Sequence, residues 1–201
     1  MTPISTISDL ELLYGTPKPA ATDKIARRMT PEFRAWITRS RFCILSTVGP
    51  EGTDASPRGD DGPVVAELDE GTLAMPDWRG NDRIDSLRNI VRDPRVSLMF
   101  FVPGSNNVVR LNGKGFVTAD ADLIAQFEKD GKKPRTVTVI QIEELYTQCA
   151  RALIRSGLWT CGDESDGLPT VGDILASLTE GRIGGKAYDA EWPHRAANSM
   201  W

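Results

Sequence analysis

The chain has 201 residues, 40% of them apolar, which is enough for one sizeable core and predicts a single α+β domain with terminal additions. It carries 24 basic and 28 acidic side chains, a net charge of −4, and this mild acidity argues against a general nucleic-acid binder. No apolar run has the length of a membrane span, and the N-terminus lacks the basic start and apolar block of a signal peptide. We therefore expect a cytoplasmic protein without membrane or nucleic-acid partners.

Histidine and cysteine usage limits the chemistry that the chain can perform alone. His194 is the only histidine, and Cys43, Cys149 and Cys161 are an odd number without C-x-x-C spacing. These counts argue against a disulfide framework, a metal site and a Ser-His-Asp triad. We expect any chemistry to come from a bound organic cofactor.

The first forty residues predict two short helices. Thr6 and Asp9 have capping-box spacing in front of an apolar stretch that Gly15 ends. Thr30 followed by Pro31 predicts a second helix start, because proline at the first helical position loses no needed donor. The apolar face of that helix carries Phe33, Trp36 and Ile37.

From Phe42 onward, short apolar runs separated by turn residues predict an antiparallel sheet. Pro57 indicates an edge strand or a bulge, and Gly113 indicates a kink. Strands joined by turns favour an antiparallel barrel over a doubly wound sheet. The expected strands are 42–48, 53–58, 64–68, 72–75, 96–102, 108–112, 114–118 and 136–142, and the expected helices are roughly 81–91, 120–129 and 172–179, the last with a Thr170/Asp173 capping box.

The segment from Pro76 to Ser86 follows a predicted strand and opens a predicted helix. A helix N-terminus offers unpaired N–H groups and a partial positive charge, which together attract anions. Asn81, Arg83 and Ser86 add side-chain donors there, and arginine grips phosphate oxygens bidentately. The alternative interpretation is a capped surface helix with a mixed-charge face.

Three further segments contribute cations. Arg58 and Gly59 lie where a strand ends, and glycine allows close approach of a ligand there; the alternative interpretation is an ordinary loop with a solvated arginine. Arg110 lies inside an apolar strand and would reinforce an anion site if it faced the same cleft. Arg151 lies in a short amphipathic run that ends at Trp159, which also fits a packing helix with surface arginines.

Taken in order, several segments resemble the pyridoxamine 5'-phosphate oxidase-like flavin proteins. Phe42–Thr47 with the turn at 49–52 is similar to their opening hairpin, and 93–100 and 109–115 are similar to later strands. Ser-Pro-Arg-Gly-Asp at 56–60 and Pro-Asp-x-x-Gly-Asn-x-Arg-x-Asp-Ser at 76–86 look like one uncharacterised branch of that family, as does Ala-Leu-Ile-Arg-Ser-x-Leu-Trp at 152–159. The likeness covers roughly residues 33–159 and also the aromatic C-terminus near Trp192 and Trp201.

The resemblance implies an antiparallel split β-barrel with flanking helices that works as a homodimer. It places the barrel at residues 41–160, after a helical extension at 1–40 and before another at 161–201 that packs on the barrel. It implies FMN at the dimer interface, with the phosphate at the helix opened by Asn81. The implied cofactor-binding residues are Asn81, Arg83 and Ser86 at the phosphate, Arg58, Gly59, Met75 and Pro76 along the ribityl chain and ring, and Arg110 and Arg151 from neighbouring strands or the partner. No catalytic residue is assigned.

Departures from the family pattern narrow the expected activity. The Arg-x-Val-Leu-Leu-Lys strand, the Ser-Arg-Lys phosphate grip and the terminal Arg-x-His motif of true pyridoxamine phosphate oxidases are missing. Val108 takes the place of a cofactor-binding Gln, and Gln148–Arg151 replaces the His-Cys-Pro-Lys of the closer branch. We therefore expect an FMN-dependent oxidoreductase for an unknown small substrate. The alternatives are a non-catalytic flavin or haem storage protein and a barrel that binds no flavin.

Overall fold

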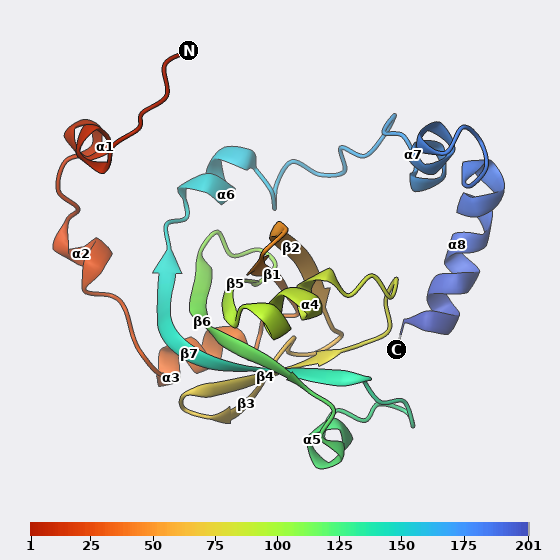
Figure 1. Cartoon of the computed structure of the whole chain (residues 1–201), viewed down its shortest axis with the longest axis horizontal. Helices are drawn as coiled ribbons and strands as arrows, with labels where there is room; N and C mark the ends of the chain where they lie inside the picture. The colour runs from red at the N-terminus through yellow and green to blue at the C-terminus, as the bar shows by residue number, and fades with distance from the viewer. Residues whose placement is uncertain (201) are drawn as a thin grey trace.

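The computed structural model describes residues 1–200, so Trp201 lies outside the described residues. The centre of the fold is a seven-stranded antiparallel sheet (Figure 1). The strands pair in the order β2-β1-β5-β6-β7-β4-β3, and the two edges do not pair with each other. The sheet therefore stays open, which confirms the α+β split barrel. The strands are β1 Phe42–Gly49, β2 Gly52–Gly59, β3 Ala66–Asp69, β4 Thr72–Asp77, β5 Arg95–Phe101, β6 Val108–Thr118 and β7 Thr136–Gln148.

Short helices flank the sheet, and their predicted caps are present. The hydroxyl oxygens of Thr6, Thr30 and Thr170 accept hydrogen bonds from backbone N–H groups in the first turns of α1, α3 and α7. In Figure 1, α1 and α2 lie on one side of the barrel and α7 and α8 on the other. The helices are α1 Ile7–Tyr14, α2 Pro19–Thr22, α3 Pro31–Ile37, α4 Asp85–Arg92, α5 Ala121–Ala125, α6 Arg151–Ser156, α7 Val171–Leu178 and α8 Gly185–Ser199. None of the helices within residues 1–200 combines the length and apolarity that spanning a bilayer requires.

The core consists of alternate residues of the central strands. Leu45, Leu98, Phe100, Leu111 and Leu145 are each at most 1% exposed, and they come from β1, β5, β6 and β7. Burial of each such side chain stabilises the fold by about 1.5–3 kcal/mol. Met29 and Ile37, which precede the sheet, complete the same cluster.

Gly113 explains why the strands predicted at 108–112 and 114–118 form one continuous strand, β6. The pairing of β6 with β7 shifts register between Asn112 and Gly113. A Cβ atom at Gly113 would lie 2.1 Å from the carbonyl oxygen of Gln141, so the strands approach here as only glycine allows. The strand β7 also continues to Gln148, beyond the predicted end at Ile142, because β6 pairs with it over that whole length.

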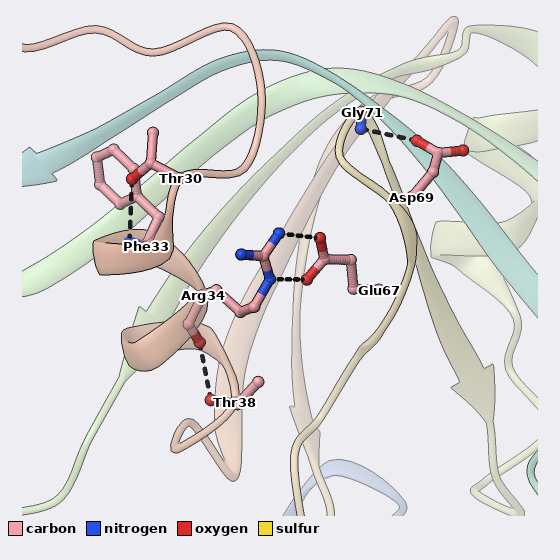
Figure 2. Close-up of polar contacts among 7 residues, drawn as sticks. All are labelled: Thr30, Phe33, Arg34, Thr38, Glu67, Asp69 and Gly71. Atoms are coloured by element: carbon pink, nitrogen blue, oxygen red, sulfur yellow. Dashed lines mark hydrogen bonds and ion pairs between the residues drawn. The ribbon is translucent and has the colours of Figure 1, made fainter.

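Helix α3 is attached to the β3–β4 hairpin by side chains (Figure 2). Arg34 donates from Nε and Nη2 to the two carboxylate oxygens of Glu67, both at 2.6 Å, and Thr30 accepts from the N–H of Phe33. The hydrogen bonds from Arg34 lower the pKa of the Glu67 carboxyl. Through this fork–fork pair, the segment before the barrel is attached to one edge of the sheet.

Helix α4 packs on the opposite edge of the sheet, at the β1–β2 hairpin. Ile90 is buried beneath it, and the side-chain amide of Asn89 donates to the Thr47 hydroxyl at 3.1 Å. A Cβ atom at Gly49 would lie 2.2 Å from Oδ1 of Asn89, so the helix approaches the hairpin over a glycine. This contact fixes where α4 begins relative to β2.

Two helix predictions need correction, and helices α2 and α8 were not predicted. Helix α4 begins at Asp85 and not at Asn81, because Asp82 and Ile84 adopt left-handed φ angles of 58° and 49°. Helix α5 ends at Ala125 and not at Lys129, because the N–H groups of residues 126–128 bond to the carbonyl three residues back and not four. Helix α8 was not predicted, since Pro193 interrupts it and its apolar residues follow no clear helical stripe.

Candidate functional site

A cleft of about 820 Å³ lies where the sheet is open, between β2 and the end of β4. The start of α4 forms its third wall. Its lining combines charged, polar and apolar surface and comes from sequence segments that are far apart. The lining residues are 54–60, Val64, 76–87, Arg135, Thr136 and Met200.

An ion pair crosses the opening of the sheet. Arg58 on β2 donates from Nη1 to Asp77 Oδ1 on β4 at 2.7 Å, and the two side chains are 21% and 20% exposed. The Nε–H of Arg58 is buried and has no hydrogen-bond acceptor. A buried donor without an acceptor costs free energy, so this group is suited to bind an oxygen atom of a ligand.

The turn before α4 is strained. Ile84 is β-branched yet adopts φ 49° and ψ 22°, a left-handed conformation that costs about 1–2 kcal/mol. As the N-cap residue, it supplies no side-chain hydrogen bond to the helix. Asn81 instead accepts from the N–H of Arg83 at 3.1 Å, within the turn. The first turn of α4 therefore has no side-chain acceptor for its N–H groups.

Carboxylates are the hydrogen-bond acceptors for most of the side-chain donors around this turn. Ser86 is 3% exposed and donates to Asp54 Oδ2 at 2.5 Å. Arg83 pairs with Asp85 at 2.5 Å, and both groups are solvent-accessible. Four arginines and five aspartates line the cleft, namely Arg58, Arg79, Arg83 and Arg135 with Asp54, Asp60, Asp77, Asp82 and Asp85. Three of these arginines, Arg58, Arg83 and Arg135, pair with an aspartate, so an anionic ligand would replace a carboxylate there, whereas Arg79 makes no ion pair within residues 1–200.

A second polar cluster lies beside the cleft and shares Asp60 and Trp78 with its lining. Trp78 Nε1 donates to Asp60 Oδ2 at 2.9 Å, and Lys129 contacts the carboxylates of Asp60 and Asp61. Lys129 also lies over the Trp78 ring, 5.7 Å from its centroid. The hydrogen bond from Lys129 lowers the pKa of the Asp61 carboxyl. This cluster was not predicted from the sequence, because no motif connects Lys129 to the loop at 60–61.

The sequence profile of one protein family, Pyridoxamine 5'-phosphate oxidase, matches residues 29–149, more than half of the chain. The chain belongs to the pyridoxamine 5'-phosphate oxidase family. No curated protein matches it.

Several solved structures are similar to part of this chain. HupZ from Group A Streptococcus is 15% identical, with a TM-score of 0.49, over 59% of this chain and 93% of that chain. General Stress Protein 26 from Bacillus anthracis is 16% identical, with a TM-score of 0.43, over 57% and 88%. An FMN-binding protein from Syntrophomonas wolfei is 13% identical, with a TM-score of 0.43, over 58% and 88%.

In this member of the pyridoxamine 5'-phosphate oxidase family, the cleft brings together six of the nine predicted cofactor-binding residues. These are Arg58, Gly59, Pro76, Asn81, Arg83 and Ser86. Met75 is 3% exposed and lies in the core, because its side chain points to the opposite side of β4 from that of Pro76.

Arg110 and Arg151 lie outside the cleft. Register places Arg110 opposite Met99 and Tyr146, on the sheet face that points away from the core. Its guanidinium lies over the Tyr146 ring at 5.3 Å and reaches Gln148 at 3.4 Å, while its Nε–H is buried without an acceptor. Arg151 is exposed at the start of α6. Neither residue contributes to the cleft of its own chain.

Proposed function

We propose that the protein is an FMN-dependent oxidoreductase for a small substrate and that the cleft between β2 and β4 binds the flavin. The observation that carries this proposal is the Arg58 guanidinium, which lines the cleft with a buried Nε–H that has no acceptor. Membership of the pyridoxamine 5'-phosphate oxidase family supports the choice of cofactor.

The start of α4 fits the phosphate end of FMN. The helix has eight residues and no side-chain cap, so the N–H groups of its first turn are available to an anion. Arg83 is exposed beside it, and Ser86, the second residue of α4, lines the cleft. On binding, the phosphate would take the place of the Asp85 carboxylate on Arg83, and charge-assisted hydrogen bonds would replace the exposed ion pair.

The carboxylates of the cleft fit the ribityl chain. A ribityl chain offers hydroxyl donors, and Asp54 and Asp77 present carboxylate oxygens in the cleft wall. Arg58 stays neutralised in part by Asp77 and donates from Nε to a ligand oxygen. The balance of four arginines and five aspartates therefore suits a ligand with one anionic end and several hydroxyl groups.

When bound, FMN supplies the electron chemistry by accepting and passing on a hydride or electrons. The protein then has to bind, orient and shield it, and no side chain has to act as a strong base. Arg110 and Arg151 do not reach the cleft of their own chain, so a second copy is the source from which they would approach the flavin. A homodimer is therefore part of the proposal.

The test is a visible absorption spectrum of the purified protein, followed by titration with FMN. We expect flavin bands and weaker FMN binding in Arg83→Ala, with wild-type binding in Arg88→Ala, an exposed arginine on the same helix outside the cleft. A colourless protein that ignores added FMN contradicts the proposal. Equal affinity in the two variants would remove the phosphate assignment alone.

Turnover separates catalysis from storage. The flavin-loaded protein is mixed without oxygen with a reduced nicotinamide, and then exposed to air. Bleaching followed by recovery of the flavin bands supports an oxidoreductase. A flavin that is bound tightly but never reduced by any donor supports a non-catalytic flavin-binding protein.

A further inference from the structure

The two C-terminal helices form a defined hairpin and not a loose tail. Asp189 on α8 accepts from the Thr170 hydroxyl at 2.6 Å and from the Gly172 N–H at 2.9 Å, so it caps the start of α7. A Cβ atom at Gly172 would lie 2.6 Å from the carbonyl oxygen of Gly185 and even closer to the Asp189 carboxylate. The helices therefore meet over a glycine that no larger residue replaces without displacement.

This hairpin ends at the cleft. Met200, the residue after α8, lines the cleft together with β2 and the segment that leads into α4. In Figure 1 the C-terminal end of α8 lies beside that segment, although the rest of the hairpin stands away from the barrel. One lining residue of the cleft therefore comes from outside the barrel.

Met200 adds an apolar side chain to the part of the cleft lining that is apolar. It is 56% exposed, and Ile84, another apolar lining residue, is 46% exposed. Both side chains have apolar surface that the protein itself leaves in water. A thioether packs well against aromatic rings and adapts its shape to them, so an aromatic ring is the group best suited to cover Met200.

We infer that the α7–α8 hairpin is a built wall of the binding cleft and that Met200 contacts the aromatic ring system of the bound molecule. This inference rests on the proposed flavin, whose fused ring is its large apolar part. The hairpin sets the position of Met200, and Met200 shields one side of the ring from water. Loss of the Met200 side chain, or of the α7–α8 packing that positions it, would expose the ring to water and leave the phosphate contacts at α4 in place.

Two variants test the inference in the full-length protein. Met200→Ala removes the side chain, and Gly172→Val forces the two helices apart, while Leu178→Ala is the control, since Leu178 is 77% exposed on the same hairpin and does not line the cleft. We expect a roughly two- to tenfold higher Kd for FMN in the first two variants, the size of one thioether–ring contact. We also expect stronger iodide quenching of the bound flavin's fluorescence, and no change for Leu178→Ala.

The outcomes are distinguishable from those for the proposed function. If wild type binds FMN and both variants bind and shield it equally well, the inference is overturned and the proposed function stands. If wild type binds no FMN, the proposed function fails, and hydrogen exchange of the ligand-free protein tests the wall itself. Faster exchange at residues 79–86 in Gly172→Val supports a hairpin that covers the cleft, and unchanged exchange overturns it.

Discussion

Helices α3 and α4 are short helices with similar ingredients and different outcomes. Each has an arginine near its first turn and a carboxylate close to that arginine. In α3, Thr30 caps the first turn, and Arg34 reaches across to Glu67 on another element. In α4, an uncapped Ile84 precedes the helix, and Arg83 pairs only with its near neighbour Asp85 in solvent.

The difference shows that the chain itself supplies hydrogen-bond partners at the start of α3 and leaves the start of α4 without a side-chain cap. The donors of α3 have partners within the chain, and the resulting contacts fasten one element to another. The start of α4 keeps a strained residue and unused N–H groups next to the cleft. Strain and missing caps reduce stability, and they accumulate where a ligand is to be bound.

The largest effect is expected from separating α4 from its hairpin. Gly49→Ala places a methyl group against Asn89, so we expect the free energy of unfolding to fall by about 1–3 kcal/mol, with weaker FMN binding because the helix start moves. Urea denaturation and FMN titration measure the two effects. Gly62→Ala is the control, because nothing lies within 4 Å of its Cβ position. Equal stability of both variants would contradict a close α4 contact.

Removal of the α3 cap should affect stability alone. Thr30→Ala deprives the Phe33 N–H of its acceptor, and we expect a loss of about 0.5–2 kcal/mol. FMN affinity should stay at the wild-type value, because α3 does not line the cleft. Thr53→Ala, at an exposed position on β2, serves as the matched control. A loss of FMN affinity in Thr30→Ala would show that the two helices are coupled.

Relief of the strain before α4 should raise stability. Ile84→Gly permits the left-handed conformation without strain. We expect the free energy of unfolding to rise by at most about 1 kcal/mol, because glycine also raises the conformational entropy of the unfolded chain and so offsets part of the gain. The melting temperature measures this gain. Ile90→Gly is the contrasting variant on the same helix, where the backbone is helical and the side chain is buried, and it should destabilise strongly. An Ile84→Gly protein that melts below wild type would argue against strain.

The Arg34–Glu67 pair should show itself as a small pH dependence. The pKa of Glu67 is lowered from 4.5, so its contribution is complete above that value and is lost as the pH falls through the lowered pKa. We expect Glu67→Gln to be less stable than wild type at pH 7 and the gap to narrow below pH 4.5. Urea midpoints at several pH values measure the gap, with Glu11→Gln on exposed α1 as control. A gap that does not change with pH would contradict the pair.

The sheet was predictable because its strands, turns and kinks follow from patterns among residues that are close in the sequence. Alternating burial, the proline of β2 and the glycine of β6 each leave a mark in the sequence, and the threonine caps do so as well. The start of α4 was not predictable, because a β-branched residue such as Ile84 rarely adopts a left-handed conformation.

The candidate site was predictable in its residue types and not in its pairings. Arg58, Arg83 and Ser86 were expected to face a ligand, and they do line one cleft. Their partners Asp77, Asp85 and Asp54 were not foreseen, since two of them come from other strands. Met200 was missed for a related reason, because no sequence motif connects it to the segments that form the rest of the cleft.

The two edges of the open sheet have a consequence for self-association. Pro57 lies in the edge strand β2 and has no N–H to offer an added strand. The other edge, β3, has only four residues and a register shift between Glu67 and Asp69. Both edges therefore disfavour growth by strand addition, which protects an unclosed sheet from fibrous aggregation. A second copy of this chain is therefore not expected to join through either strand edge.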